Sequence, residues 1–119
     1  MTPAPLERPA HGTLLRSFAG TVHVDPQVAY DKLAVALAPT SPEGGSFEVD
    51  PVRRLLVLQG GWWYRAEYRV LADPEGSRIE FEIVNVAQPA HWAGPITGRS
   101  ALKAAPAAFS ALLTSLEHD

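Results

Sequence analysis

An almost unbroken alternation of apolar and polar residues from Phe47 to Ala87 constrains the fold of this chain more than any other feature. A period of two puts successive side chains on opposite faces of a β-strand, so it predicts strands that are buried on one face. Turn-forming residues interrupt the alternation at 50–53, 60–61 and 73–76. The segment therefore predicts consecutive hairpins, because turns this short join only antiparallel strands.

The two clearest turns also predict which residues lie opposite each other in this sheet. Gly60-Gly61 has the sequence of a two-residue hairpin turn, and residues 73–76 (DPEG) form a four-residue turn. The apolar residues then match across both turns, which supports these registers, since a slip of one residue would reverse every face. The expected cross-strand pairs are Gln59 with Trp62, Val57 with Tyr64, Leu55 with Ala66, Leu58 with Trp63, Tyr64 with Asn85, Tyr68 with Phe81, Val70 with Ile79 and Arg69 with Glu80.

The residues before this run predict one more strand and one short helix. Residues 13–24 alternate as a strand. Asp25-Pro26 then supplies an N-cap and a proline at the first helical position. Apolar residues follow at helical spacing until Pro39, so the helix is predicted to end near Ala38.

After the strands, apolar residues from Leu102 to Leu116 recur at helical spacing and predict an amphipathic helix. Pro106 lies inside it and predicts either a kink or a fresh start, because its ring removes a backbone hydrogen bond. Together the elements predict an α+β domain: an antiparallel sheet of about five strands, one short helix after the first strand and a long C-terminal helix packed on the sheet.

Three segments of the sequence carry a family resemblance: VHVDPQVAYDKLA, YRVLADPEGSRIEFEI and FSALLTSLE. Across residues 13–117 the chain resembles the START-related helix-grip superfamily, the SRPBCC group that includes polyketide cyclase/dehydrase-like proteins. The resemblance implies a curved sheet wrapped around the long C-terminal helix. It also implies a cavity between the sheet and this helix for a small apolar or aromatic molecule.

Composition sets the domain boundary at the N-terminal end. Residues 1–12 contain three prolines and one large aliphatic residue, too little apolar surface to offset the entropy lost on ordering. They predict a loose N-terminal tail, followed by a single helix-grip domain at residues 13–119.

Composition also narrows the class of partner. The 119 residues have a formal net charge of -3, and the ten Lys and Arg are scattered along the chain, which argues against nucleic acid or an anionic membrane as partner. Without cysteine there is no disulfide or thiolate chemistry. No apolar run is long enough for a membrane span and no signal peptide is evident, so we expect a cytoplasmic protein. No cofactor is predicted, and the four histidines lack metal-site spacing.

The expected registers gather polar groups at one end of the apolar sheet face. Gln59, Trp62, Tyr64 and Asn85 come within neighbour or diagonal reach there, and Tyr68 follows on the same face. An amide and a phenol beside an indole can orient a ligand carbonyl or hydroxyl in an apolar pocket. The alternative is that these groups satisfy one another or lie in water at an open end of the sheet.

Two further residues are candidates for chemistry. Arg16 shares a strand face with Phe18, so alternation points it inward as an anchor for an anion or carbonyl, although such an arginine more often extends to solvent. His91, beside Trp92, precedes the last helix and is a candidate general acid or base at a cavity entrance. A loop histidine is more often simply solvated.

The sequence leaves three functions open. The first is binding of a small apolar or aromatic molecule in a cavity. The second is a cyclase/aromatase-type enzyme in which Tyr64, Arg16 or His91 moves a proton. The third is an interaction module that uses the outer sheet face, where the expected register sets Leu58, Trp63 and Val86 in one row. An exposed apolar row of this kind predicts a homodimer or another protein partner.

Overall fold

The computed structural model describes residues 5–40, 45–60, 62–87 and 93–117 of the chain. Within these residues lie five strands, two longer α-helices, one short α-helix and one 3-10 turn. In chain order they are β1 (Thr13–Val22), α1 (Pro26–Leu37), the 3-10 turn (Ala38–Thr40), β2 (Ser46–Asp50), β3 (Leu55–Gly60), β4 (Tyr64–Asp73), β5 (Gly76–Asn85), α2 (Ala93–Thr97) and α3 (Arg99–Leu116).

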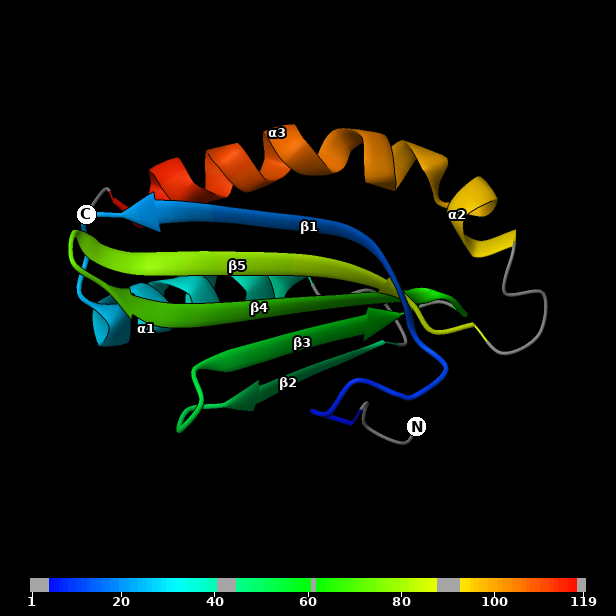
Figure 1. Cartoon of the computed structure of the whole chain (residues 1–119), viewed down its shortest axis with the longest axis horizontal. Coiled ribbons are helices and arrows are strands. Elements are labelled where there is room, and N and C mark those ends of the chain that lie inside the picture. Colours follow the sequence, from blue (N-terminus) through cyan, green and yellow to red (C-terminus); the bar gives the residue numbers. More distant parts are fainter. Residues whose placement is uncertain (1–4, 41–44, 61, 88–92, 118–119) are drawn as a thin grey trace.

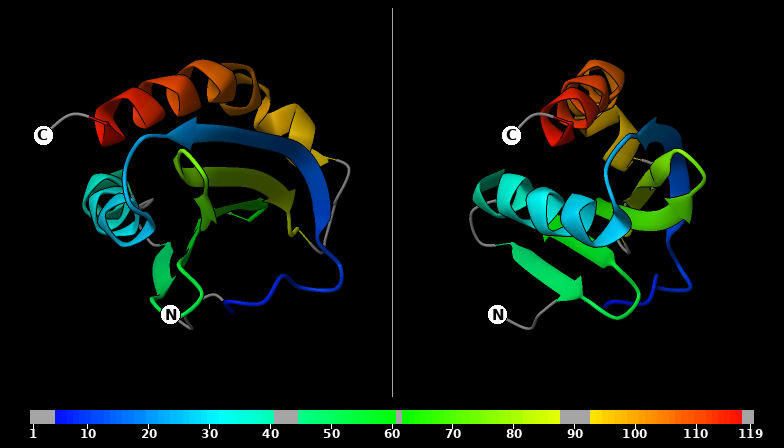
Figure 2. Two further views of the ribbon diagram at one scale, coloured as in Figure 1. Left: turned by 60° about the vertical axis from the view of Figure 1, so that its left-hand side comes forward. Right: turned by 90° about the vertical axis from the view of Figure 1, so that its left-hand side faces the viewer.

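The strands form an antiparallel sheet in the order β1-β5-β4-β3-β2 (Figure 1). Consecutive hairpins join β2 to β3, β3 to β4 and β4 to β5. Strand β1 pairs with β5 and forms the other edge of the sheet. Both longer helices lie on one side of this sheet: α3 runs over β1, and α1 contacts β4 and β5 (Figure 2). The expected α+β class is confirmed, with its helix after the first strand and its C-terminal helix.

Helix α1 begins and ends where the sequence predicts. Asp25 Oδ2 accepts a hydrogen bond from the Gln27 amide at 3.0 Å, and Pro26 occupies the first helical position. The helix ends at Leu37, and Pro39 lies in the 3-10 turn that follows. The buried side chains of α1 join the core cluster on the sheet: Ala29, Tyr30, Leu33 and Leu37.

The β4–β5 hairpin has the predicted register. Tyr68 lies opposite Phe81, and the turn closes with Asp73 opposite Gly76. Asp73 Oδ1 accepts a hydrogen bond from the Glu75 amide at 2.9 Å, as an aspartate at the start of a turn often does. Gly76 has a φ of 137°, which glycine adopts without steric cost. This turn sequence therefore specifies both the length and the register of its hairpin.

The predicted β3–β4 register is wrong. Gly60 belongs to β3 and pairs with Tyr64, so residues 61–63 connect the strands and Gly60-Gly61 is not the turn. Leu58 lies opposite Ala66 instead of Trp63. This shift of three residues is odd, so it reverses the face of every β3 residue relative to β4. Leu56 and Leu58 face the helices, and Leu55, Val57 and Gln59 face the other side of the sheet.

The burial of Trp63 explains the longer connection. Trp63 is 8% exposed and belongs to the core cluster on the helix side. A Cβ placed on Gly98, between α2 and α3, would lie 1.8 Å from Trp63 Cζ2, so the indole packs directly on this glycine. A two-residue turn would have kept Trp63 on the opposite face.

The C-terminal helix packs as predicted and continues through its proline. Leu102, Ala105, Phe109 and Leu116 are its buried side chains. Pro106 lies inside α3, and the fresh start occurs earlier, at Gly98. Figure 1 shows α3 arching over the sheet. The helix therefore covers the core formed by the helix-facing side of the sheet.

Residues 5–12, expected to be a loose tail, lie across the other side of the sheet, which we call the outer face (residues 55, 57, 65, 67, 82 and 84). Arg65, on this face, is fully buried. Its guanidinium donates to the carbonyl oxygens of Pro5 and Leu6 at 2.6 and 2.9 Å, and to Glu67 Oε2 at 2.7 Å. The Arg65 side chain thus holds the N-terminal segment against β4.

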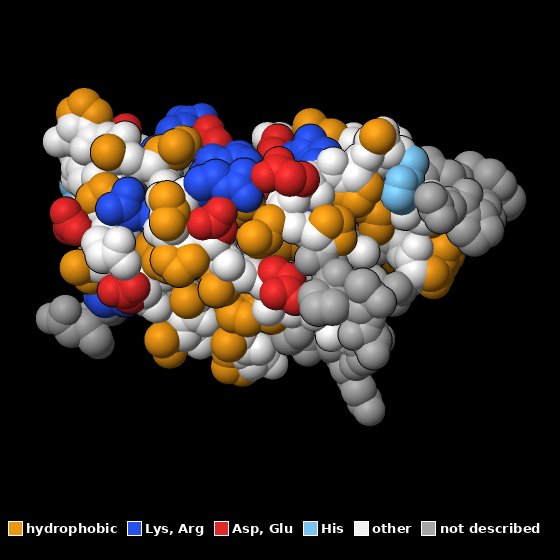
Figure 3. Space-filling model, turned by 90° about the horizontal axis from the view of Figure 1, so that it is seen from below, with side chains coloured by type: hydrophobic (Ala, Val, Ile, Leu, Met, Phe, Trp, Pro, Cys, Tyr) orange, Lys and Arg blue, Asp and Glu red, His pale blue; other side chains and the backbone are white. Residues whose placement is uncertain are grey.

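A second group of charges strengthens this attachment. Arg8 donates to Glu67 Oε1 and to Glu82 Oε1, both at 2.6 Å. Burial alone would raise the pKa of Glu67, but hydrogen bonds from Arg8 and Arg65 outweigh it and lower this pKa. Figure 3, viewed from the side opposite α3, shows basic and acidic side chains next to one another among hydrophobic groups.

Candidate functional site

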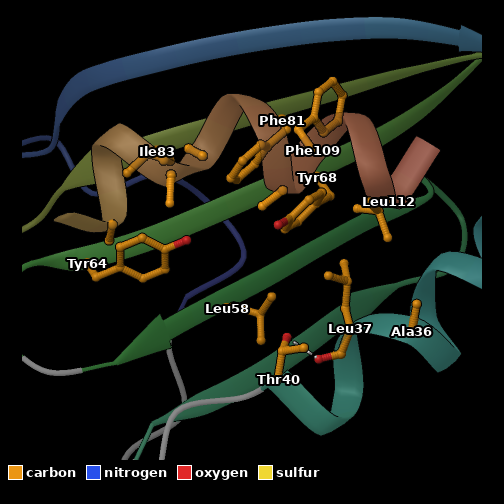
Figure 4. Close-up of a pocket in the computed structure, with 14 residues that line it drawn as sticks. Ala36, Leu37, Thr40, Leu58, Tyr64, Tyr68, Phe81, Ile83, Phe109 and Leu112 are labelled. Atoms are coloured by element: carbon orange, nitrogen blue, oxygen red, sulfur yellow. Dashed lines mark hydrogen bonds between the residues drawn. The ribbon is translucent and has the colours of Figure 1, made fainter. Parts of the chain in front are cut away.

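A cavity of about 350 Å³ lies between the sheet, the C-terminal end of α1 and residues 101–112 of α3 (Figure 4). Apolar side chains dominate its lining, and the cavity is partly open to solvent. The lining residues are Ala36, Leu37, Thr40, Leu58, Tyr64, Tyr68, Phe81, Ile83, Ala101, Ala104, Ala105, Ala108, Phe109 and Leu112.

Strand β4 supplies the two phenols of the cavity. Tyr64 and Tyr68 lie four residues apart on one strand, so alternation puts both on the helix-facing side. Figure 4 shows their hydroxyl groups pointing toward one another across the cavity. Tyr68 is 7% exposed, and neither hydroxyl makes a hydrogen bond to any residue that the structure describes.

Both phenols remain protonated at neutral pH. Burial raises the pKa of Tyr64, and it raises the pKa of Tyr68 further, where the neighbouring Tyr64 adds to the effect. A neutral phenol carries one O–H donor and also accepts hydrogen bonds. The cavity therefore presents two donors aimed at the same volume.

Aromatic rings form one wall behind these hydroxyls. The rings of Tyr68 and Phe81 stack with centroids 4.4 Å apart and an interplanar angle of 3°. Phe109, from α3, packs on Phe81 at 5.6 Å. Such offset contacts stabilise beyond the apolar area they bury. They hold the Tyr68 ring in one orientation and so fix where its hydroxyl points.

Small side chains of α3 form the facing wall. Ala101, Ala104, Ala105 and Ala108 recur at helical spacing and all contact the cavity. Because a methyl group is the whole side chain, this wall leaves volume that a leucine or phenylalanine would fill. The alanines were not predicted as site residues, since small residues on a helix are common in any packed domain.

The structure places the other predicted site residues away from this cavity. Gln59 lies on the outer face and accepts a hydrogen bond from Arg65 at 3.2 Å. Trp62 is 44% exposed in the β3–β4 connection. The positions of Gln59 and Trp62 follow from the three-residue shift in register, which brings Leu58 rather than Gln59 to the cavity. Of the predicted cluster, Tyr64 and Tyr68 line the cavity.

Asn85 and Arg16 also lie outside the lining. Asn85 is 1% exposed, and its Oδ1 accepts a hydrogen bond from the Ala87 amide at 3.1 Å. Its side chain packs against Gly94, where an added Cβ would lie within 3.0 Å of it. Arg16 follows a bulge in β1, is exposed, and donates to the Leu15 carbonyl at 2.8 Å. The same bulge turns Leu14 toward the outer face, opposite Val84.

The predicted dimer row does not form. Leu58 and Trp63 are buried in the helix-side core, and the Val86 amide donates to the Trp63 carbonyl at 2.8 Å. The Val86 carbonyl accepts a hydrogen bond from His11 Nε2 at 2.8 Å, so the N-terminal segment also reaches this end of the sheet. His91 and Trp92 lie outside the described residues.

No helix in the described ranges is long and apolar enough to cross a membrane. Among the same residues, His, Asp and Glu side chains do not gather in groups of three or more that could hold a metal ion.

The fold and the cavity define an α+β domain with an apolar pocket that contains two phenol donors. No protein-family model, curated protein or solved structure matches this chain.

Proposed function

We propose that this protein binds a small apolar or aromatic molecule in the cavity between the sheet and α3. The observation that carries the proposal is a cavity of about 350 Å³ with an apolar lining and two convergent phenol hydroxyls. Small-molecule sites are typically concave, mostly apolar and equipped with a few placed polar groups. Their usual volume begins at roughly 300 Å³, so this cavity suits a small ligand.

The family resemblance supports the same function. An antiparallel sheet that curves beside a long C-terminal helix is compatible with the helix-grip fold of START-related proteins. We place the chain in that group as part of the proposal, because a ligand site between sheet and helix is what the resemblance implies.

The lining favours binding over acid-base catalysis. None of the fourteen lining residues in the described part of the chain is Asp, Glu, His, Lys or Arg. The two tyrosines have pKa values raised by burial, so neither is a base at neutral pH. A cyclase/aromatase-type enzyme needs a group that moves a proton at its operating pH. These lining residues therefore support binding better than they support such an enzyme.

Filling the cavity from α3 tests the proposal. N-phenyl-1-naphthylamine is a neutral aromatic probe whose fluorescence rises in apolar sites, and we expect it to bind the wild type with a saturable signal. Ala104→Phe should weaken this binding by about tenfold or more, because the ring occupies the cavity. Ala107→Phe is the matched control: Ala107 lies on the same helix, is exposed and does not line the cavity.

The control variant should bind the probe within about twofold of the wild type. Equal weakening in both variants would show that the probe binds elsewhere or responds to a general loss of folding. Circular dichroism at the titration temperature separates those two explanations. The proposed function is overturned if neither this probe nor a small neutral naphthalene binds the wild type with a saturable signal.

A further inference from the structure

The cavity wall contains a donor that the described residues leave without a hydrogen-bond partner. The Tyr68 side chain is mostly buried, at 7% exposed, and its hydroxyl lies on the wall of the cavity. It makes no hydrogen bond to any described residue, and Figure 4 shows it pointing into the cavity. A hydroxyl on the wall of an apolar pocket that has no protein partner can donate to an acceptor on a ligand. This donor is therefore positioned for an acceptor on the occupant.

Tyr64 provides a second donor from the same strand. Its hydroxyl points toward that of Tyr68, so the two donors face the same part of the cavity. The third hydroxyl in the lining belongs to Thr40, and it is engaged, since Thr40 Oγ1 donates to the Leu37 carbonyl at 2.7 Å. The free donor capacity of the lining is thus concentrated at the two tyrosines.

The lining also restricts the charge of the occupant. Among the described residues that line the cavity, no side chain is ionised at neutral pH. A carboxylate or ammonium group placed among these lining residues would lose hydration without gaining an ionic partner from them, which is unfavourable. A ketone, ester or hydroxyl oxygen loses much less hydration and regains a hydrogen bond from a phenol.

The volume gives the approximate size. An apolar cavity of about 150 Å³ admits benzene, and the cavity here is about 350 Å³. It therefore has room for roughly two fused rings with a short substituent. The stacked rings of Tyr68 and Phe81 along one wall favour a flat occupant.

We infer that the occupant is an uncharged, flat, ring-containing molecule whose ketone, ester or hydroxyl oxygen accepts hydrogen bonds from Tyr68 and Tyr64. This inference rests on the proposed function, because it specifies the ligand of the same cavity. It adds two properties that an apolar cavity alone does not require: an oxygen acceptor and the absence of charge.

Three naphthalenes of nearly equal shape test both properties. 2-Acetylnaphthalene carries the acceptor, 2-isopropylnaphthalene lacks it, and 2-naphthoate carries a charge. Their dissociation constants are measured at pH 7 by isothermal titration calorimetry or by displacement of the fluorescent probe. We expect 2-naphthoate to bind at least about tenfold more weakly than 2-acetylnaphthalene.

Tyrosine-to-phenylalanine variants identify the donors. Tyr68→Phe removes only the hydroxyl and should weaken 2-acetylnaphthalene by about fivefold, the usual value of a neutral hydrogen bond. The same variant should bind 2-isopropylnaphthalene within about twofold of the wild type. Tyr64→Phe should show the same selective loss, so either variant can report if the other folds poorly.

Tyr30→Phe is the matched control. Tyr30 is also buried, and its hydroxyl also lacks a hydrogen-bond partner, but it lies in α1 and does not line the cavity. It should change the affinity for neither compound.

The outcomes separate this inference from the proposed function. A selective loss for the acetyl compound in either cavity variant, together with weak naphthoate binding, supports the inference. Equal affinities of wild type and both variants, or tight naphthoate binding, would overturn the inference while the cavity remains a binding site. If none of the three compounds and no fluorescent probe binds the wild type, the proposed function fails and the inference fails with it.

Discussion

Replacing Arg65 by methionine should destabilise the fold strongly. The Arg65 side chain is fully buried on the outer face and donates to Glu67, to Gln59 and to two carbonyl oxygens of the N-terminal segment. Methionine retains much of the aliphatic length but supplies no donor. The variant therefore leaves the Glu67 carboxylate with one cation fewer. The carbonyl oxygens of residues 5 and 6 lose their hydrogen bonds to β4.

Removing one member of a buried ion pair typically costs about 3–5 kcal/mol. Glu67 keeps the hydrogen bonds from Arg8, so we expect the lower end, about 3 kcal/mol. For a chain of this size, 1 kcal/mol lowers Tm by about 4 °C, so the expected loss is about 12 °C. Urea denaturation followed by circular dichroism measures the free energy directly.

Arg69→Met is the matched control on the same strand. The Arg69 side chain is 39% exposed, and its guanidinium lies 3.8 Å from Glu80 Oε1. Exposed pairs of this kind contribute about 0–1 kcal/mol. If Arg65→Met and Arg69→Met destabilise the protein equally, within about 0.5 kcal/mol, the N-terminal segment is not held by Arg65 and the reasoning is refuted.

The pH dependence supplies an independent check. The pKa of Glu67 is lowered in the folded state below its ordinary value of 4.5. Its contribution to stability is therefore present above the unfolded-state pKa and is lost as pH falls through the lower folded-state value. The difference in unfolding free energy between wild type and Arg65→Met should narrow in acid. A difference that stays constant from pH 7 to about pH 3 would contradict the assignment to Glu67.

Three further predictions concern α3 and its ends. Phe109→Ala should lower the free energy of unfolding by about 3–5 kcal/mol, because Phe109 is 6% exposed and packs on two other rings; a loss below about 0.5 kcal/mol in urea denaturation would place the helix elsewhere. Gly98→Ala should cost about 1–3 kcal/mol and shift tryptophan fluorescence to longer wavelength, because the added Cβ meets the Trp63 ring at 1.8 Å; unchanged fluorescence would exclude this contact. The His23 pKa is raised by the hydrogen bond to Glu117, so this pair stabilises below the ordinary pKa of 6.5 and its effect is lost as pH rises through the raised value; in NMR titrations Glu117→Gln should move the His23 midpoint down toward 6.5, and an unmoved midpoint would disprove the pairing.

The two main hairpins show which registers a sequence can specify. The DPEG turn contains an aspartate that accepts from the turn backbone and a glycine at positive φ, so its length is determined locally. Gly60-Gly61 is compatible with several loop lengths, because glycine tolerates most backbone conformations. The loop that forms is selected by the packing of Trp63 under Gly98, a contact between residues far apart in the sequence.

The same difference between locally and distantly determined registers explains which residues of the candidate site could be predicted. Tyr64 and Tyr68 were found because the β4–β5 register was predictable and both lie on the helix-facing side. Gln59 was placed wrongly because its position depends on the β3–β4 loop. The composition of residues 5–12 is typical of a tail and gives no indication of the hydrogen bonds that Arg65 donates to Pro5 and Leu6. The sequence signal for these contacts is the alternation of Arg65 and Glu67 with cavity residues, which puts two charges side by side on a sheet face that needs partners.

Side chains of strand β4 alternate between the cavity and the outer face of the sheet. Tyr64 and Tyr68 point to the cavity, and Arg65 and Glu67 point to the N-terminal segment. The ordering of residues 5–12 therefore restrains the backbone of the strand that carries both phenol donors, without any side chain of that segment appearing in the cavity lining. The two phenols can donate to one ligand oxygen only if their separation is maintained. The contacts of residues 5–12 with the outer face help to maintain it, because they hold the backbone of β4 in place.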